Sequence, residues 1–151
     1  MNRKLVLGLV FAGITALAVL AVACGGDDNE IDAELAVWAA SICRASENLD
    51  AVVEGNFSTS TNVELLGETL DDLNTVRHPS EAAEYGRNFV NLLTVYHEEA
   101  EKRLRGVPLG TDIEEFNREQ EARLDRADER FLDTPVSDGV GQALRSAGCG
   151  R

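Results

Sequence analysis

The sequence has few of the residues from which most active sites are built. In 151 residues it holds two histidines, three cysteines, three prolines and 5% aromatic residues. Phosphate-binding glycine loops, nucleophile elbows, haem-attachment motifs and closely spaced cysteine pairs are missing. Runs that alternate apolar and polar residues are missing too, which argues against β-sheet. The readable signals therefore concern location, attachment and fold class.

Basic residues are also scarce. The chain has 14 Lys and Arg against 27 Asp and Glu, a formal net charge of −13. Without residues 1–23, which include Arg3 and Lys4, the net charge is about −15. Such a surface repels the phosphates of nucleic acids, so no nucleic-acid partner is expected. It suits a cationic partner, divalent ions or simple solubility.

The N-terminal segment has the layout of a secretory signal peptide. Residues 1–4 are basic, residues 5–23 form an uncharged apolar run, and small residues close that run. This order is typical of a signal that is removed on export. The apolar run has 19 residues, within the ~17–25 that can span a bilayer. An uncleaved N-terminal anchor helix is therefore the alternative.

Ala21-Val22-Ala23-Cys24 resembles the lipobox of bacterial lipoproteins, with Ala21 where that motif usually has Leu. The resemblance implies cleavage before Cys24 and fatty acyl chains such as palmitate on that cysteine. It also implies a lipid-anchored protein on the extracytoplasmic side of the cell membrane or envelope. Two or three acyl chains hold stably, at ~0.8 kcal/mol per buried methylene. Residues 24–31 then form the lipidated cysteine and a flexible acidic tether.

Cys43 and Cys149 remain once Cys24 carries lipid. Export implies an oxidising compartment, where two remaining cysteines commonly form a disulfide. The two positions are 106 residues apart, and the chain-entropy model gives such a loop about 4–5 kcal/mol of stabilisation as an upper figure. This pairing leaves Cys24 single, as lipid attachment requires.

Residues 32–151 are predicted to form one all-α domain. Apolar residues recur three and four positions apart, which indicates amphipathic helices. We expect an antiparallel bundle of four main helices plus a short C-terminal helix, after a cleavable N-terminal signal helix. The expected helices cover about 32–53, 61–77, 79–105 and 111–131, and the last begins at Thr134-Pro135 or Ser137 and ends at Gly148.

Several residues specify details of this bundle. Thr61 and Thr111 have capping-box spacing to glutamates three positions later. Pro79 suits the first position of the helix over 79–105, and Gly86 on its apolar stripe suggests a close helix–helix crossing. The helix over 111–131 has a thin apolar stripe and dense charge, including a four-apart Glu119–Arg123 pair. It should be the most exposed and least stable long helix.

The two aromatic residues Phe57 and Tyr85 lie off the apolar stripes. If they are exposed, they are candidate contacts for a partner, although isolated exposed aromatics are common.

The candidates for metal chemistry are weak. His97 and Glu101 are four residues apart on one expected helix, but a structural or catalytic zinc needs three or four ligands. A di-iron bundle site needs two Glu-x-x-His motifs, and position 94 is Thr. His78 precedes Pro79 in a turn and is expected to be exposed or to cap a helix. No catalytic residue, metal or cofactor is predicted.

The leading functional hypothesis is a non-enzymatic interaction or accessory module with a protein partner in the cell envelope, held at the membrane through Cys24. The alternative is a bundle that binds a small ligand or cation between its helices, near residues such as Tyr96 and His97. An enzyme is the third hypothesis, and it would need several polar residues buried together.

Overall fold

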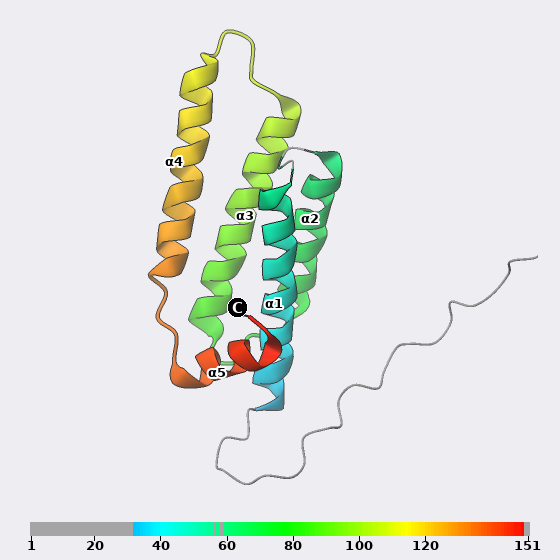
Figure 1. Cartoon of the computed structure of the whole chain (residues 1–151), viewed down its shortest axis with the longest axis vertical. Helices are drawn as coiled ribbons and strands as arrows, with labels where there is room; N and C mark the ends of the chain where they lie inside the picture. Colours follow the sequence, from blue (N-terminus) through cyan, green and yellow to red (C-terminus); the bar gives the residue numbers. More distant parts are fainter. Residues whose placement is uncertain (1–31, 56, 58, 150–151) are drawn as a thin grey trace, which may run out of the picture.

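The computed structural model describes residues 32–55, 57 and 59–149 (Figure 1). This part of the chain contains no strand. Its helices are α1 (Ala33–Glu54), α2 (Ser60–Thr75), α3 (Ala83–Arg105), α4 (Ile113–Leu132) and α5 (Asp138–Ala147). The four long helices run alternately up and down, and α5 is short (Figure 1). The predicted fold class is confirmed.

The proposed signal peptide, Cys24 and the tether lie outside the described residues. Within the described chain, no helix is both long enough and apolar enough to cross a membrane.

Side-chain caps fix where three of the long helices begin. Asp32 accepts a hydrogen bond from the amide of Glu34 at the start of α1, and Asp112 accepts from two amides at the start of α4. Thr59 accepts from the amide of Asn62 at the start of α2. Such caps satisfy amides that have no partner within the helix. The predicted caps at Thr61 and Thr111 are thus wrong by one or two residues.

Pro79 does not begin α3, contrary to the prediction. A turn intervenes, in which the amide of Ala82 donates to the carbonyl of Pro79, and α3 starts at Ala83. At the other end of the chain, Ser137 caps α5 and Gly148 ends it with φ of 99°. That left-handed conformation is open to glycine at little cost, and it turns Cys149 back toward α1.

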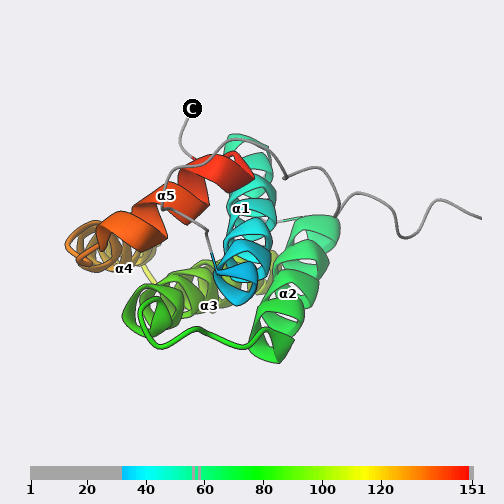
Figure 2. The ribbon, with the colours of Figure 1, turned by 90° about the horizontal axis from the view of Figure 1, so that it is seen from below.

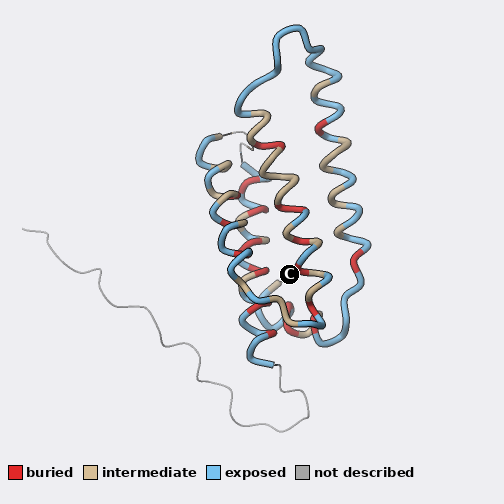
Figure 3. Tube along the Cα trace, turned by 180° about the vertical axis from the view of Figure 1, so that it is seen from behind, coloured by how far each residue is buried: buried red, intermediate tan, exposed pale blue. Residues whose placement is uncertain are grey.

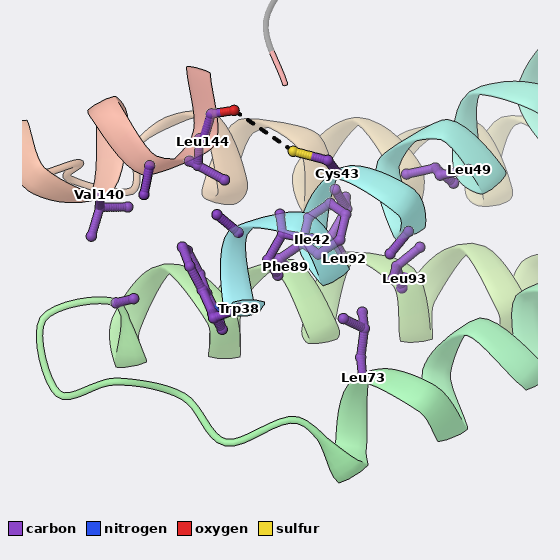
Figure 4. Close-up of a cluster of buried hydrophobic side chains, with 14 of the residues drawn as sticks. Trp38, Ile42, Cys43, Leu49, Leu73, Phe89, Leu92, Leu93, Val140 and Leu144 are labelled. Atoms are coloured by element: carbon purple, nitrogen blue, oxygen red, sulfur yellow. Dashed lines mark hydrogen bonds between the residues drawn. The ribbon is translucent and has the colours of Figure 1, made fainter. Parts of the chain in front are cut away.

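The apolar core lies between α1, α2 and α3 and is closed by α5 (Figure 4). Figure 4 shows Trp38, Ile42, Phe89, Leu93 and Leu144 pointing into it from three of these helices. No fully buried core residue comes from α4, which adds only the partly buried Ala127 and Phe131. The core therefore belongs to a bundle of three long helices and α5.

Helix α4 is an arm on this bundle. Of the other helices it packs closely only against α3, and Figure 3 shows it exposed along most of its length. The only residue of α4 that is buried is Gln120. The predicted exposure of this helix is confirmed, and its low stability stays a prediction.

Helix α5 lies across the lower end of the bundle and reaches from α4 to α1 (Figure 2). It buries Val140, Ala143 and Leu144. The structure joins Cys43 of α1 to Cys149, with Cα atoms 5.2 Å apart, so the sulfurs lie at bonding distance as the sequence predicted. The Sγ of Cys43 also lies 3.7 Å from the carbonyl oxygen of Leu144 (Figure 4). A bridged sulfur has no proton to donate, so this is a contact only.

His78 is neither free nor a helix cap. Its Nδ1 accepts a hydrogen bond of 3.0 Å from the indole nitrogen of Trp38, which is fully buried. Gly86 makes room for the imidazole, since a Cβ at that position would lie 2.2 Å from Nδ1. The close approach predicted at Gly86 is thus to the side chain of His78 and not to another helix.

Phe57 and Tyr85 do not project into solvent as candidate partner contacts. Phe57 packs edge-on against Tyr96, and the guanidinium of Arg103 lies 5.4 Å from its ring centre. Tyr85 contacts the rings of Trp38 and Phe131 edge-on. Both are partly buried against the core, because loop and helix ends fold over positions that helical periodicity left outside the stripes.

Candidate functional site

The proposed lipidation site, Cys24, lies outside the described residues. Cys43 and Cys149 are buried or partly buried beside α5 and bonded to each other. A bridged pair of this kind staples the chain and supplies no nucleophile.

The weak metal pair does not converge on a site. Glu101 forms an ion pair with Arg105, at 3.4 Å. The ring of His97 lies against α2, with Nε2 3.4 Å from where a Cβ on Gly67 would be. In residues 32–55, 57 and 59–149, no three His, Cys, Asp or Glu side chains group as metal ligands would.

The contact between α3 and α4 differs from the other helix contacts. Hydrogen bonds and ion pairs hold these two helices together, whereas apolar packing holds the others. We call this contact the α3–α4 seam. It comprises five polar contacts of α3 with α4 and with Thr134 just after it: Arg103–Gln120, Glu99–Arg123, Glu98–Arg123, Tyr96–Asp128 and Asn88–Thr134. Its apolar part is the ring of Phe131, which packs on Tyr85 and Phe89.

Arg123 is the central residue of the seam. One guanidinium nitrogen donates to Glu99 and another to Glu98, so one α4 side chain binds two carboxylates of α3. The hydrogen bond to Glu98 is the main reason that the pKa of Arg123 is raised, with contributions from Glu99. Charge-assisted bonds of this kind are stronger than neutral ones and fix the side-chain geometry.

Tyr96 makes a second fixed contact across the seam. Its hydroxyl lies 3.0 and 3.1 Å from the two carboxylate oxygens of Asp128 and donates to this group. Burial, followed by the charge and the hydrogen bond of Asp128, raises the pKa of Tyr96 well above its usual value. Burial also raises the pKa of Tyr85. Both tyrosines are therefore uncharged at neutral pH.

A hollow of about 480 Å³ opens along the seam toward the α3–α4 turn. We call it the Glu99 hollow. Its lining residues are Glu99, Lys102, Phe116, Glu119, Gln120, Ala122, Arg123 and Arg126. A second hollow of about 290 Å³ lies further along the same seam, and Arg123 lines both.

Two of the residues that line the Glu99 hollow, Glu99 and Gln120, each have a buried polar atom without a protein partner. Glu99 is 0% exposed. Its Oε1 accepts from Lys102 at 2.8 Å and from Arg123, but its Oε2 accepts no hydrogen bond. Gln120 is 4% exposed, and its Nε2 donates none. Buried polar atoms are nearly always paired, so each such exception needs an explanation, such as a water, an ion or a ligand.

The orientation of Gln120 is fixed by its neighbour. Arg103 donates from Nε to the Oε1 of Gln120 at 2.8 Å, and an Arg can only donate. A flipped amide would set two donors against each other. The free Nε2 of Gln120 therefore remains a donor without an acceptor.

The crevice between α1 and α2 is different. It measures about 240 Å³, and Asn48 donates across it to the hydroxyl of Thr69 at 3.0 Å. No buried unpartnered polar atom of the described chain lies there. It offers a polar surface without an unmet hydrogen bond.

Sequence reasoning passed over Glu99 and Gln120, yet both leave a trace in the pattern. Glu99 follows Leu92 and Tyr96 at helical spacing, and Gln120 stands between Phe116 and Leu124. A polar residue inside an apolar stripe signals a buried polar group. The sequence does not reveal which helix Glu99 or Gln120 contacts, because that depends on how α3 packs against α4.

Compared with known protein families, with curated proteins and with solved structures, the chain matches none.

Proposed function

We propose that this chain is a lipid-anchored, non-enzymatic binding protein on the extracytoplasmic side of a bacterial membrane, which holds a small polar ligand in the Glu99 hollow. The observation that carries the ligand-binding part is that two residues lining one hollow, Glu99 and Gln120, each have a buried polar atom without a partner, Oε2 and Nε2. Attachment rests on the signal layout and on Cys24.

A binding role fits the chemistry of the hollow better than a catalytic one. The Oε1 of the one fully buried carboxylate of the described chain, Glu99, is already engaged by Lys102 and Arg123. Neither histidine lines the Glu99 hollow, so the commonest general base is missing there. What the hollow supplies is hydrogen-bond recognition.

Ligand binding is tested on the full chain in detergent micelles, by a thermal-shift screen of metabolites followed by amide NMR. A true ligand raises the melting temperature, because it stabilises the folded protein by an amount that grows with the logarithm of ligand concentration above Kd. It must also move the amide signals of Glu99, Gln120 and Arg123. Binding that moves only signals between α1 and α2 would reject the Glu99 hollow as the site.

Attachment is tested by labelling cells with a radioactive or clickable fatty acid. Labelling should be lost in Cys24→Ser and kept in Cys43→Ser/Cys149→Ser, because only the first removes the proposed acyl acceptor. Equal labelling of all three proteins would refute the lipid anchor. Loss of labelling in Cys24→Ser, with the protein still in the membrane fraction, would favour an uncleaved anchor helix.

A protein partner is the second candidate, favoured by the turn between α3 and α4. Leu104, Leu109 and Ile113 are exposed there, Leu109 by 106% of its reference area. Figure 1 places this turn at the end of the bundle opposite the start of α1. A photo-crosslinker at position 109 should capture a partner, and Ile113→Asp should abolish capture while Leu132→Asp, at the other end of α4, should not.

A further inference from the structure

We propose that the ligand of the Glu99 hollow is a small polyhydroxylated anion, a sugar acid or a sugar phosphate. This inference rests on the proposed function and adds the chemical class of the ligand. It follows from the polarity of the two unpartnered atoms and from the charges around them.

The two unpartnered atoms specify complementary groups. The Oε2 of Glu99 accepts, so the ligand atom facing it must carry a hydrogen, as a hydroxyl does. The Nε2 of Gln120 donates, so the ligand must also present an oxygen acceptor. A hydroxyl group can donate and accept, and a polyol carries several at neighbouring carbons. An apolar ligand would leave both protein atoms unpaired, at a large cost in affinity.

The charge of the hollow specifies an anionic group. Three cations, Lys102, Arg123 and Arg126, line it together with two carboxylates, Glu99 and Glu119. Lys102 and Arg123 are neutralised by their ion pairs with Glu99 and Glu98, so Arg126 is the cation left for a ligand. An unpaired guanidinium favours an anion over a cation at the same place.

Arg126 is the group that meets the anion. Lys102 and Arg123 already bind Glu99 and Glu98, whereas Arg126 makes no hydrogen bond or ion pair within the described residues. A guanidinium binds a carboxylate or a phosphate through two parallel N–H groups. Both anions therefore satisfy the same residue.

A divalent cation fits the hollow poorly. Calcium requires six to eight oxygen ligands and magnesium six, largely carboxylates, carbonyls and water. Here only Glu99 Oε2 and Glu119 offer free carboxylate oxygen, and three cations stand beside them. A water bridging Glu99 and Gln120 would satisfy the two atoms but would leave Arg126 without an anion.

The experiment compares matched six-carbon probes by isothermal titration calorimetry at low ionic strength, with the full chain in micelles. Gluconate and sorbitol 6-phosphate carry both hydroxyls and an anion. Sorbitol keeps the hydroxyls without the charge, and hexanoate keeps the charge without the hydroxyls. We expect gluconate or sorbitol 6-phosphate to bind roughly tenfold more tightly than sorbitol and hexanoate, because each control lacks one set of contacts. The anion that binds more tightly identifies carboxylate or phosphate as the source.

Variants assign that binding to the hollow. Arg126→Gln removes an exposed cation and should weaken the bound anion roughly tenfold. Arg118→Gln, on the same helix but outside the hollow, is the matched control and should bind normally. Gln120→Glu keeps an oxygen for Arg103 but replaces the free donor with a charged acceptor, so it should also lose binding. Circular dichroism and melting temperature establish that each variant is folded.

Each outcome separates this inference from the proposed function. If sorbitol binds as tightly as gluconate, or Arg126→Gln has no effect, the anionic class is wrong while the Glu99 hollow remains a ligand site. If a cation such as spermidine binds there instead, the class is again wrong. If no probe and no screened metabolite moves the signals of Glu99 and Gln120, the hollow holds only water and both proposals fall.

Discussion

The bundle of α1, α2, α3 and α5 and the α4 arm are held by different forces. The bundle and the turn before α3 contain every buried apolar residue of the described chain, and a disulfide ties α5 to α1. The arm buries only Gln120 and is held to α3 largely by ion pairs and hydrogen bonds. Apolar burial is strong and tolerant of orientation, whereas polar contacts depend on each partner. We therefore expect the bundle to supply most of the stability, whereas the proposed ligand site lies between the arm and α3.

The largest expected effect comes from removing the disulfide. Cys43→Ser/Cys149→Ser should lower the free energy of unfolding by about 4 kcal/mol, because a bridge across 106 residues strongly restricts the unfolded chain. Urea unfolding of the variant and of the oxidised wild type measures the difference. An unchanged midpoint would mean that the bridge adds nothing to the bundle. Free thiols at both positions in natively exported protein would show that it does not form.

Paired leucine substitutions compare the two regions directly. Leu93→Ala in the bundle should cost about 3 kcal/mol, because the side chain is fully buried and its loss leaves a cavity. Leu132→Ala on the arm should change stability by less than about 0.5 kcal/mol, because that side chain is 79% exposed. Chemical denaturation of both variants gives the values. Equal losses would contradict the distinction between core and arm.

Arg123→Ala should loosen the arm and leave the bundle intact. It removes the α4 partner of Glu98 and the fully buried Glu99, with a local cost of roughly 1–3 kcal/mol. Amide hydrogen exchange should speed up in α4 while α1 and the first half of α3 stay protected. Arg118→Ala is the matched control, since Arg118 lies on the same helix away from the seam. Uniform acceleration across all helices would show that α4 unfolds only with the bundle.

Two glycines test the packing around α3, Gly86 on α3 against His78 and Gly67 on α2 against His97. Gly86→Ala should destabilise by about 1–2 kcal/mol despite alanine's higher helix propensity, because its Cβ would displace His78 from Trp38. Gly67→Ala, at an ordinary contact distance of 3.4 Å from His97, should stabilise by about 0.5–1 kcal/mol. Thermal unfolding separates the two signs. A stabilising Gly86→Ala would mean that the His78 contact has little weight.

The smallest expected effect is the change in stability as the tyrosines lose their protons, which takes place only at alkaline pH. Burial, together with Asp128 for Tyr96, raises the pKa of both tyrosines in the folded state. A raised folded pKa contributes stability below the unfolded tyrosine pKa of about 10, and this contribution is lost as pH rises above it. Ultraviolet absorbance should therefore show little tyrosinate in the folded protein near pH 10. Asp128→Asn should lower the pKa of Tyr96 and leave that of Tyr85 unchanged.

Much of the fold was predictable because it depends on local pattern. Apolar residues at helical spacing placed the four long helices, and Gly148 marked the end of the last one. The errors fall at helix starts. Thr59 and Asp112, rather than Thr61 and Thr111, accept the first amides, because neighbouring polar residues compete for the same role. Pro79 precedes a turn that the spacing alone does not reveal.

The candidate site was less predictable because it forms between helices. Neither Glu99 nor Gln120 belongs to a motif, and each is distinguished only by burial and by an unpartnered atom. The Glu119–Arg123 pair suggested by four-residue spacing gives way to contacts of Arg123 with Glu98 and Glu99 across the seam. A buried carboxylate needs a cation more than a solvated one does.

By itself, the sequence determined the helices and their order, and it predicted the pairing of Cys43 with Cys149. The helices follow from the periodicity of apolar residues, and the cysteine pairing follows from the number of cysteines. Only the tertiary structure decided that α4 packs on α3 alone, that His78 meets Trp38, and that Glu99 and Gln120 share one hollow. These features depend on which faces meet, since residues far apart in sequence become neighbours only through packing.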